Sequence, residues 1–214
     1  MSGDVKRRRY RSERRREQAA QTRARVLAAA AGVFRERGYE RASIAAIAAA
    51  AGVADETVYA HFRNKRTLLG ELVRDAVRGD DPRPVPEQEA PARLVEAVDA
   101  RELLHRFADD VARRLERAAP LVAVVAAAAP GEPELAELLR LLHEDRSRNL
   151  GRAVDALAAA ARLRVPHRDA LDAFWALTSP ELYELLTGLR GWSRRRYTTW
   201  LAASLERLLV EDAP

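Results

Sequence analysis

The chain has 214 residues, of which 48% are hydrophobic, so it can bury a core, and a wholly disordered protein is excluded. It has no cysteine, which excludes disulfides, zinc–thiolate sites and cysteine catalysis and suits a reducing cytoplasm. Residues 1–70 contain 16 Lys or Arg against 7 Asp or Glu, and the rest contain 21 against 25, so the N-terminal third favours a polyanionic partner.

The chain begins with a strongly basic segment. Residues 1–16 contain eight basic side chains and no hydrophobic period, which predicts a flexible arm and not a secretory signal. The basic residues are Lys6, Arg7, Arg8, Arg9, Arg11, Arg14, Arg15 and Arg16. Two interpretations stay open: arginines that enter a minor groove of DNA, or a general attraction to phosphates.

Four helices are predicted after the arm. Their spans are about 17–38, 44–51, 55–61 and a fourth that begins at residue 64. Ser43 and Asn64 are N-cap residues for the second and fourth helices, and Gly38 and Gly52 end the first and second. Prolines are frequent between Gly79 and Pro91, which predicts a linker there.

Longer amphipathic helices are predicted beyond the linker. Their spans are about 101–118, a short helix between Pro120 and Pro130, 133–163, 167–189 with a bend at Pro180, and a last helix after Ser193. No strand pattern and no run of about 18 apolar residues is visible, so an all-α protein without a membrane span is expected. The predicted divisions are an arm (1–16), a helix-turn-helix domain (17–66), a connecting helix and linker (67–91), and a helical domain (92–214).

The second and third predicted helices, with a glycine between them, match a helix-turn-helix. The alanines of the second helix allow the third to approach closely, Gly52 supplies the left-handed turn, and Val53 fills the core. The third helix can then present one face to a major groove of DNA.

Residues 23–72 resemble the N-terminal domain of the tetracycline-repressor (TetR) family. The matching residues are Ala29, Phe34, Gly38, Tyr39, Ser43, Ile44, Ile47, Ala48, Ala51, Gly52, Val53, Thr57, Val58, Tyr59, Phe62, Asn64, Lys65, Arg66, Leu68 and Leu69. The resemblance implies a helix-turn-helix domain that binds double-stranded DNA, followed by a helical domain for effector binding and dimerisation.

The resemblance also assigns DNA contacts by position. Tyr59 and His61 match phosphate contacts, Thr57 matches a base or backbone contact, and Lys65 matches a phosphate-binding lysine. Packing alone for Tyr59 and simple solvation for His61 are the alternatives. The candidate DNA-binding residues are Ser43, Asp55, Glu56, Thr57, Tyr59, His61, Arg63, Asn64, Lys65 and Arg66.

The sequence departs from the family pattern at the turn and in the second helix. Asp55 and Glu56 stand where the family often has a basic residue and glycine; they repel phosphates, but a carboxylate accepts from cytosine N4. Ala45 and Ala46 occupy positions where the family often has polar side chains that contact bases. Base recognition is therefore assigned to the third helix and the arm.

Two further sites are expected in the C-terminal domain. The resemblance implies a homodimer through the last two helices, with candidate contacts Leu182, Tyr183, Leu186, Trp200, Leu201 and Leu208, although these side chains could instead fill the subunit's own core. The candidate effector-pocket residues are His105, Phe107, His143, Arg146, Asn149, Phe174 and Trp175. The domain offers few polar candidates, which favours a largely apolar small molecule; snorkelling of Arg146, or its pairing with Asp109 or Asp110, is the alternative.

The leading hypothesis is a repressor that binds a palindromic operator as a homodimer and is released by a small-molecule effector. An enzyme is disfavoured because no nucleophile elbow, phosphate loop or metal cluster is visible, so no catalytic residue, metal ligand or cofactor is predicted. A nucleoid-type protein without an operator or an effector is the remaining alternative.

Overall fold

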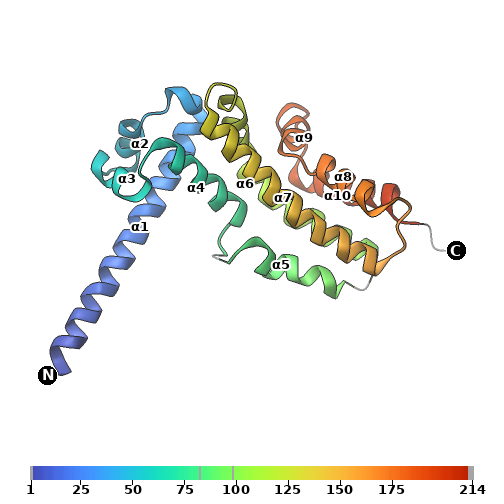
Figure 1. Cartoon of the computed structure of the whole chain (residues 1–214), viewed down its shortest axis with the longest axis horizontal. Helices are drawn as coiled ribbons and strands as arrows, with labels where there is room; N and C mark the ends of the chain where they lie inside the picture. The colour runs from blue at the N-terminus through green and yellow to red at the C-terminus, as the bar shows by residue number, and fades with distance from the viewer. Residues whose placement is uncertain (1, 82, 98, 212–214) are drawn as a thin grey trace. The chain divides into compact units, whose positions relative to one another are not determined.

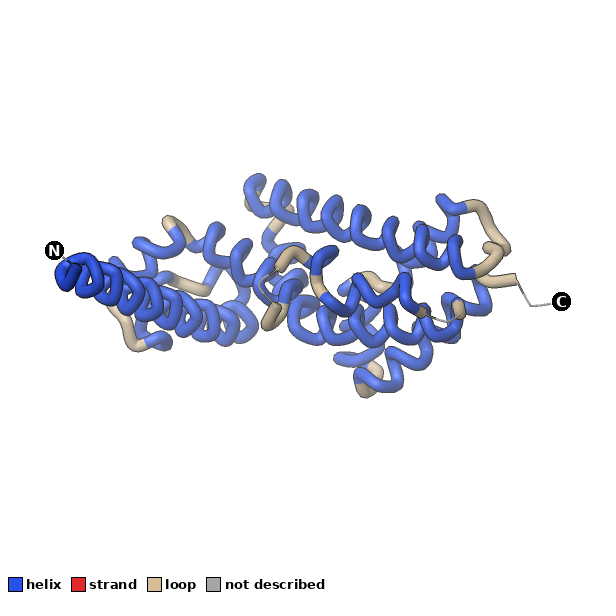
Figure 2. Tube along the Cα trace, turned by 90° about the horizontal axis from the view of Figure 1, so that it is seen from below, coloured by secondary structure: helices blue, strands red, loops and turns tan. Residues whose placement is uncertain are grey.

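The computed structural model describes residues 2–81, 83–97 and 99–211, with the backbone alone for residues 2–13, 92 and 95. Most of these residues are helical and none forms a strand (Figure 2). One isolated β-bridge joins Leu163 to Val210. The all-α class expected from the sequence is confirmed. The chain divides into an N-terminal unit, residues 1–72, and a C-terminal unit, residues 73–214.

The N-terminal unit consists of one long helix and shorter helices that pack against its C-terminal part (Figure 1). The helices are α1 (Ser2–Arg41), α2 (Ile44–Ala51), α3 (Asp55–Phe62) and the first part of α4 (Lys65–Arg78). Phe34, Ile47, Phe62 and Leu68 are fully buried at the centre of the unit. Since α4 is unbroken from Lys65 to Arg78, one helix belongs to both units.

Helix α1 begins earlier than the sequence predicted. The expected flexible arm, residues 1–16, is helical from Ser2 onward. Arginine is a good helix former, and this segment has one glycine and no proline, so helix propensity suffices without an apolar period. At the other end Gly38, with φ 69° and ψ −179°, interrupts the helical geometry where a helix end was predicted.

The C-terminal unit is built around the long helix α6. Its helices are η1 (Val85–Glu87), α5 (Glu89–Ala92), η2 (Arg93–Glu96), α6 (Ala100–Ala128), α7 (Pro133–Ala160), α8 (His167–Leu177), α9 (Pro180–Glu184), the π-helical turn η3 (Leu185–Leu189) and α10 (Arg194–Leu209). Helices α7, α9 and α10 pack against α6. Phe107 meets Phe174 with ring centroids 4.8 Å apart, and Tyr183 meets Tyr197 at the same distance.

The break predicted at Pro120 is wrong, because α6 continues through it. A proline removes one hydrogen bond from a helix interior, which costs about 3 kcal/mol. Leu121, Val122 and Val125 are buried beyond it, and their packing keeps the helix continuous. The predicted bend at Pro180 is confirmed: α8 ends at Leu177, and Ser179 caps α9 by accepting from the Leu182 amide. None of the helices described is both long and apolar enough to cross a membrane.

Candidate nucleic-acid interface

The turn between α2 and α3 has the geometry that a helix-turn-helix requires. The Ser43 hydroxyl accepts from the Ala46 amide at 3.1 Å and caps α2. Gly52 has φ 66° and ψ 40°, the left-handed conformation that favours glycine, and the Val53 amide donates back to the Ala48 carbonyl at 3.0 Å. These contacts turn the chain sharply between two helices of eight residues each.

One face of α3 is fixed in the core and the other faces solvent. Val58 and Phe62 are fully buried, whereas Tyr59 is 51% exposed and both acids of the first turn are exposed. Thr57 and His61 are half-buried beside them. The structure therefore places the predicted contact residues of α3 on an accessible surface, and the alternative that Tyr59 serves packing alone does not match its exposure.

The loop after α3 presents an exposed arginine on a strained backbone. Arg63 has φ 52° and ψ −48°, and the Asn64 amide donates to the Phe62 carbonyl across it, which forms a γ-turn. The Asn64 side chain caps α4 by accepting from the Thr67 amide at 2.8 Å, as predicted. The side chains of Ser43 and Asn64 are therefore engaged as N-caps, and they position α2 and α4.

Lys65 has a different environment from the one that its predicted role requires. Its ammonium donates to the carbonyl oxygens of Tyr39, Glu40 and Ala42 at 2.8, 3.4 and 3.1 Å. It also lies 4.1 Å from the centroid of the Tyr39 ring. An ammonium has three donors, and these contacts use all of them. Lys65 therefore holds the C-terminus of α1 in this structure, and its phosphate contact stays a prediction.

A second cation joins helices in the same unit. Arg23 of α1 pairs with Glu71 of α4 at 2.9 Å, and its guanidinium lies 5.4 Å from the centroid of the Phe62 ring. The sequence analysis missed this contact because its partners are 48 positions apart and neither is among the residues that match the family pattern. Lys65 thus joins α4 to the end of α1, and Arg23 joins α1 to α4 and to Phe62 of α3.

The C-terminal unit contains an open groove of about 840 Å³ between α6, α7 and α8. Of the predicted pocket residues, His143 and Trp175 line it, with ring centroids 5.1 Å apart. Arg146 lies behind Trp175, its guanidinium carbon 4.2 Å from the ring centroid. Phe107 and Phe174 are buried in the adjoining core.

Phe107, Arg146 and Phe174 do not line the groove itself, and the two remaining predicted pocket residues lie elsewhere. His105 is exposed on α6, and Asn149 accepts from the exposed Arg152 on the surface of α7. Neither lines the groove. Helical spacing placed them beside apolar stripes, but a position at the edge of a stripe faces solvent when no other helix covers it. The alternative pairing of Arg146 is also wrong, since Asp109 and Asp110 pair with Arg113 and Arg114.

The predicted dimer residues separate by burial. Tyr183 and Leu201 are buried in the subunit's own core, which corrects their assignment to an interface. Leu182, Leu186 and Trp200 are half-buried. Leu208 is exposed, and so are Leu185 and Leu189, which the sequence analysis had missed. The π-helical turn at Leu185–Leu189 changes the phase of the helix and brings these two leucines to the surface.

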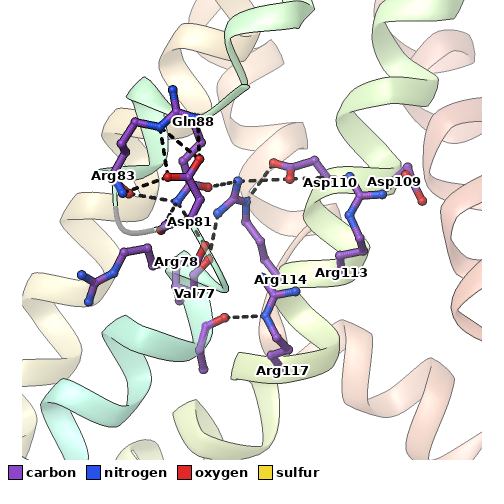
Figure 3. Close-up of polar contacts among 11 residues, drawn as sticks. Val77, Arg78, Asp81, Arg83, Gln88, Asp109, Asp110, Arg113, Arg114 and Arg117 are labelled. Atoms are coloured by element: carbon purple, nitrogen blue, oxygen red, sulfur yellow. Dashed lines mark hydrogen bonds and ion pairs between the residues drawn. The ribbon is translucent and has the colours of Figure 1, made fainter. Parts of the chain in front are cut away.

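A polar cluster fixes the linker after α4 (Figure 3). The buried Gln88 donates its amide to the carbonyls of Arg78, Asp81 and Arg83 at 3.1, 3.2 and 2.9 Å. Its amide oxygen accepts from Arg114 at 2.8 Å. Gln88 thus holds the linker in a closed loop.

Two arginines of α6 reach from this cluster to the last turn of α4 (Figure 3). Arg114 donates to the Val77 carbonyl at 2.8 Å and pairs with Asp110, and Arg117 donates to the Ala76 carbonyl at 2.9 Å. Cations are favourable at a helix C-terminus, so α6 caps α4. Burial and the neighbouring Arg114 lower the pKa of Arg117 from its ordinary value.

Comparisons with known proteins agree with this geometry. Residues 26–72 match the model of the family described as bacterial regulatory proteins, tetR family. The chain is 40% identical over 50 residues to the fatty acid metabolism regulator protein of Bacillus subtilis and 42% identical over 60 residues to the HTH-type transcriptional regulator TtgR of Pseudomonas putida. These matches span 26% and 29% of those relatives' lengths, well under two thirds.

Solved structures extend the likeness to the whole fold. A TetR-family transcriptional regulator from Mesorhizobium loti superposes with a TM-score of 0.68 at 25% identity and covers 89% of this chain and 96% of its own. NalD, described as the secondary repressor of the MexAB-OprM multidrug efflux pump in Pseudomonas aeruginosa, gives 0.68 at 25% identity over 92% of this chain and 100% of its own.

Proposed function

Because residues 26–72 match the tetR family of bacterial regulatory proteins, we propose that the protein is a sequence-specific transcriptional regulator that binds double-stranded DNA through α3. The exposed face of α3 carries the proposal. An α-helix with its side chains is about 10–12 Å in diameter, so α3 fits a major groove that is about 12 Å wide. Asp55, Glu56, Thr57, Tyr59 and His61 are the side chains that would meet bases and phosphates there.

The proposed regulator acts as a homodimer on a palindrome. One α3 contacts half of a site, so two copies related by a two-fold axis recognise two inverted half-sites. Leu185, Leu189 and Leu208 leave an apolar surface on η3 and α10, which a second copy of the chain would cover. Leu182, Leu186 and Trp200 would contribute at the edge of this interface.

The proposed mode of action is repression relieved by a small molecule. The groove between α6, α7 and α8 supplies a place for an effector, and apolar walls with a few polar groups suit an organic ligand. The likeness to NalD, a repressor by its description, supports the same sign of regulation. An effector that favours a dimer with differently spaced α3 helices would release the operator.

The proposal is tested by footprinting the purified protein on DNA from its own promoter region. We expect the protein to protect a palindrome. The variants Tyr59→Ala and Arg63→Ala should each bind it about tenfold more weakly, because each loses one contact to a charged phosphate per half-site. Arg168→Ala, which removes an exposed charge from α8, is the control and keeps wild-type affinity. Equal affinity for unrelated sequences, or no palindrome protected, would refute the proposal; the first result would favour a nucleoid-type protein.

A further inference from the structure

Arg146 is a half-buried cation for which no carboxylate among the described residues forms an ion pair. The terminal nitrogen Nη1 of its guanidinium group is buried and has no hydrogen-bond partner among the described residues. Burial lowers the pKa of Arg146 to about 10, and the exposed Glu181 and the phenol of Tyr197 oppose this effect. An unpaired buried charge is costly, so a protein that retains one usually supplies it with a partner.

Part of the guanidinium already has a structural role. Its other terminal nitrogen donates to the Trp175 carbonyl and to the Thr178 hydroxyl, the latter at 3.1 Å, at the C-terminal end of α8. The Thr178 hydroxyl in turn donates to the Phe174 carbonyl at 2.7 Å. These contacts fix the position of the side chain and leave the other terminal nitrogen, Nη1, as the donor that a ligand could use.

The groove lies directly beside this donor. His143 and Ser147, which precede and follow Arg146 on the same side of α7, both line the groove, as does Trp175, whose ring packs on the guanidinium. Trp175 is half-buried, so it stands between the guanidinium and the open space. The other groove-lining residues are apolar except Arg140, Glu144 and Asp172, which are exposed.

We propose that the effector of this regulator is an amphipathic anion: an apolar body lies in the groove, and its carboxylate binds the free nitrogen of Arg146 after Trp175 moves aside. The inference rests on the proposed function, which supplies the effector, and it changes the expected ligand from a largely apolar molecule to an organic acid. His143 lies on the path to the carboxylate and adds a second donor from the same wall.

The test uses the full chain and a set of probes that differ only in the head group: octanoate, octanamide, octanol and octylamine. Dissociation constants come from calorimetry. We expect octanoate to bind at least about tenfold more tightly than octanamide, because a hydrogen bond to a charged group changes the affinity by about this factor. Octylamine should bind most weakly.

Variants assign the preference to Arg146. Arg146→Met should bind octanoate and octanamide equally, Arg146→Lys should keep part of the preference, and Arg152→Met, an exposed arginine on the same helix, should keep all of it. Circular dichroism verifies that each variant folds; if Arg146→Met does not fold, Arg146→Lys and the wild-type head-group series decide the question.

Equal affinity of the wild type for all four probes, no binding of any of them, or an undiminished preference in a folded Arg146→Met would overturn the inference. These results differ from a failure of the proposed function. A protein that protects a palindrome and releases it with octanol but not with octanoate is a regulator without an acid site. A protein that selects octanoate through Arg146 but protects no DNA has the acid site without the proposed function.

Discussion

Replacing Lys65 with methionine separates two roles that this position can have. Methionine keeps most of the hydrocarbon stem and removes the ammonium, together with its contacts to the carbonyls of Tyr39, Glu40 and Ala42. If Lys65 holds the end of α1, the variant loses stability. If Lys65 binds a phosphate, the variant loses a DNA contact instead.

The structure sets the size of the stability effect. A hydrogen bond from a charged donor contributes about 1.5–3 kcal/mol, and a cation at a helix C-terminus contributes about 0.3–1 kcal/mol. Lys65 is half-buried, so water can replace part of what is lost. We therefore expect Lys65→Met to lower the free energy of unfolding by about 2 kcal/mol, which moves the urea midpoint by about 1 M when the m-value is about 2 kcal/mol/M.

Two measurements on the same protein distinguish the roles. Urea unfolding at a fixed protomer concentration gives the stability, and fluorescence anisotropy over a series of KCl concentrations gives the dependence of DNA affinity on salt. Each phosphate contact contributes about 0.9 to the slope of log K against log salt concentration. We expect Lys65→Met to keep the wild-type slope, whereas the control Arg63→Met, at an exposed position, lowers the slope and leaves stability nearly unchanged.

The reasoning is refuted if Lys65→Met unfolds at the wild-type urea concentration and shows a smaller salt slope. That pair of results would mean that the ammonium leaves the α1 carbonyls when DNA binds and that the family role applies to this chain.

Four other changes have defined outcomes. Arg63→Gly should raise the free energy of unfolding by about 1 kcal/mol, because glycine adopts positive φ without strain; no gain in urea unfolding would contradict this. Gln88→Leu should cost about 2–3 kcal/mol in the same assay, since the linker carbonyls and Arg114 lose their partner; a cost under about 0.5 kcal/mol would show that water replaces the amide. Leu189→Asp, at a side chain that is 80% exposed, should convert dimers to monomers in sedimentation equilibrium without loss of helix, and an unchanged dimer would place the interface elsewhere. Burial, with a smaller contribution from the neighbouring Arg146, lowers the pKa of His143 below its ordinary 6.5. The unfolded chain therefore takes up a proton at this position before the folded chain does, and the free energy of unfolding decreases as the pH falls through and below 6.5. His143→Gln should remove that part of the decrease, and a pH profile identical to that of the wild type would refute it.

The helix-turn-helix was predictable residue by residue because its signals are local. A hydroxyl three residues before a helical amide forms a cap, and a glycine between two apolar helices forms a left-handed turn; both rules hold at Ser43 and Gly52. The buried face of α3 follows from the spacing of Val58 and Phe62. In each of these cases the partners lie within one or two turns along the chain.

The features that escaped prediction depend on contacts between distant segments. Lys65 reaches residues more than twenty positions away, and helix α6 runs through Pro120 because neighbouring helices bury its flanks. Tyr183 and Leu201 were assigned to an interface because a large apolar side chain looks the same in sequence whether its own subunit or a second copy covers it. The exposed Leu189 depends on a single π-helical turn, for which no reliable sequence signal exists.

The loop around Gln88 constrains evolution in an unusual way. Its amide nitrogen contacts only main-chain oxygens, which every amino acid possesses, so these hydrogen bonds fix no side-chain identity among residues 80–87. The number of residues is not free, because one insertion moves a carbonyl about 3 Å or more along the chain and out of reach. Related regulators that keep a glutamine at this position should therefore have the same number of residues between the end of α4 and this glutamine, although the residues themselves differ.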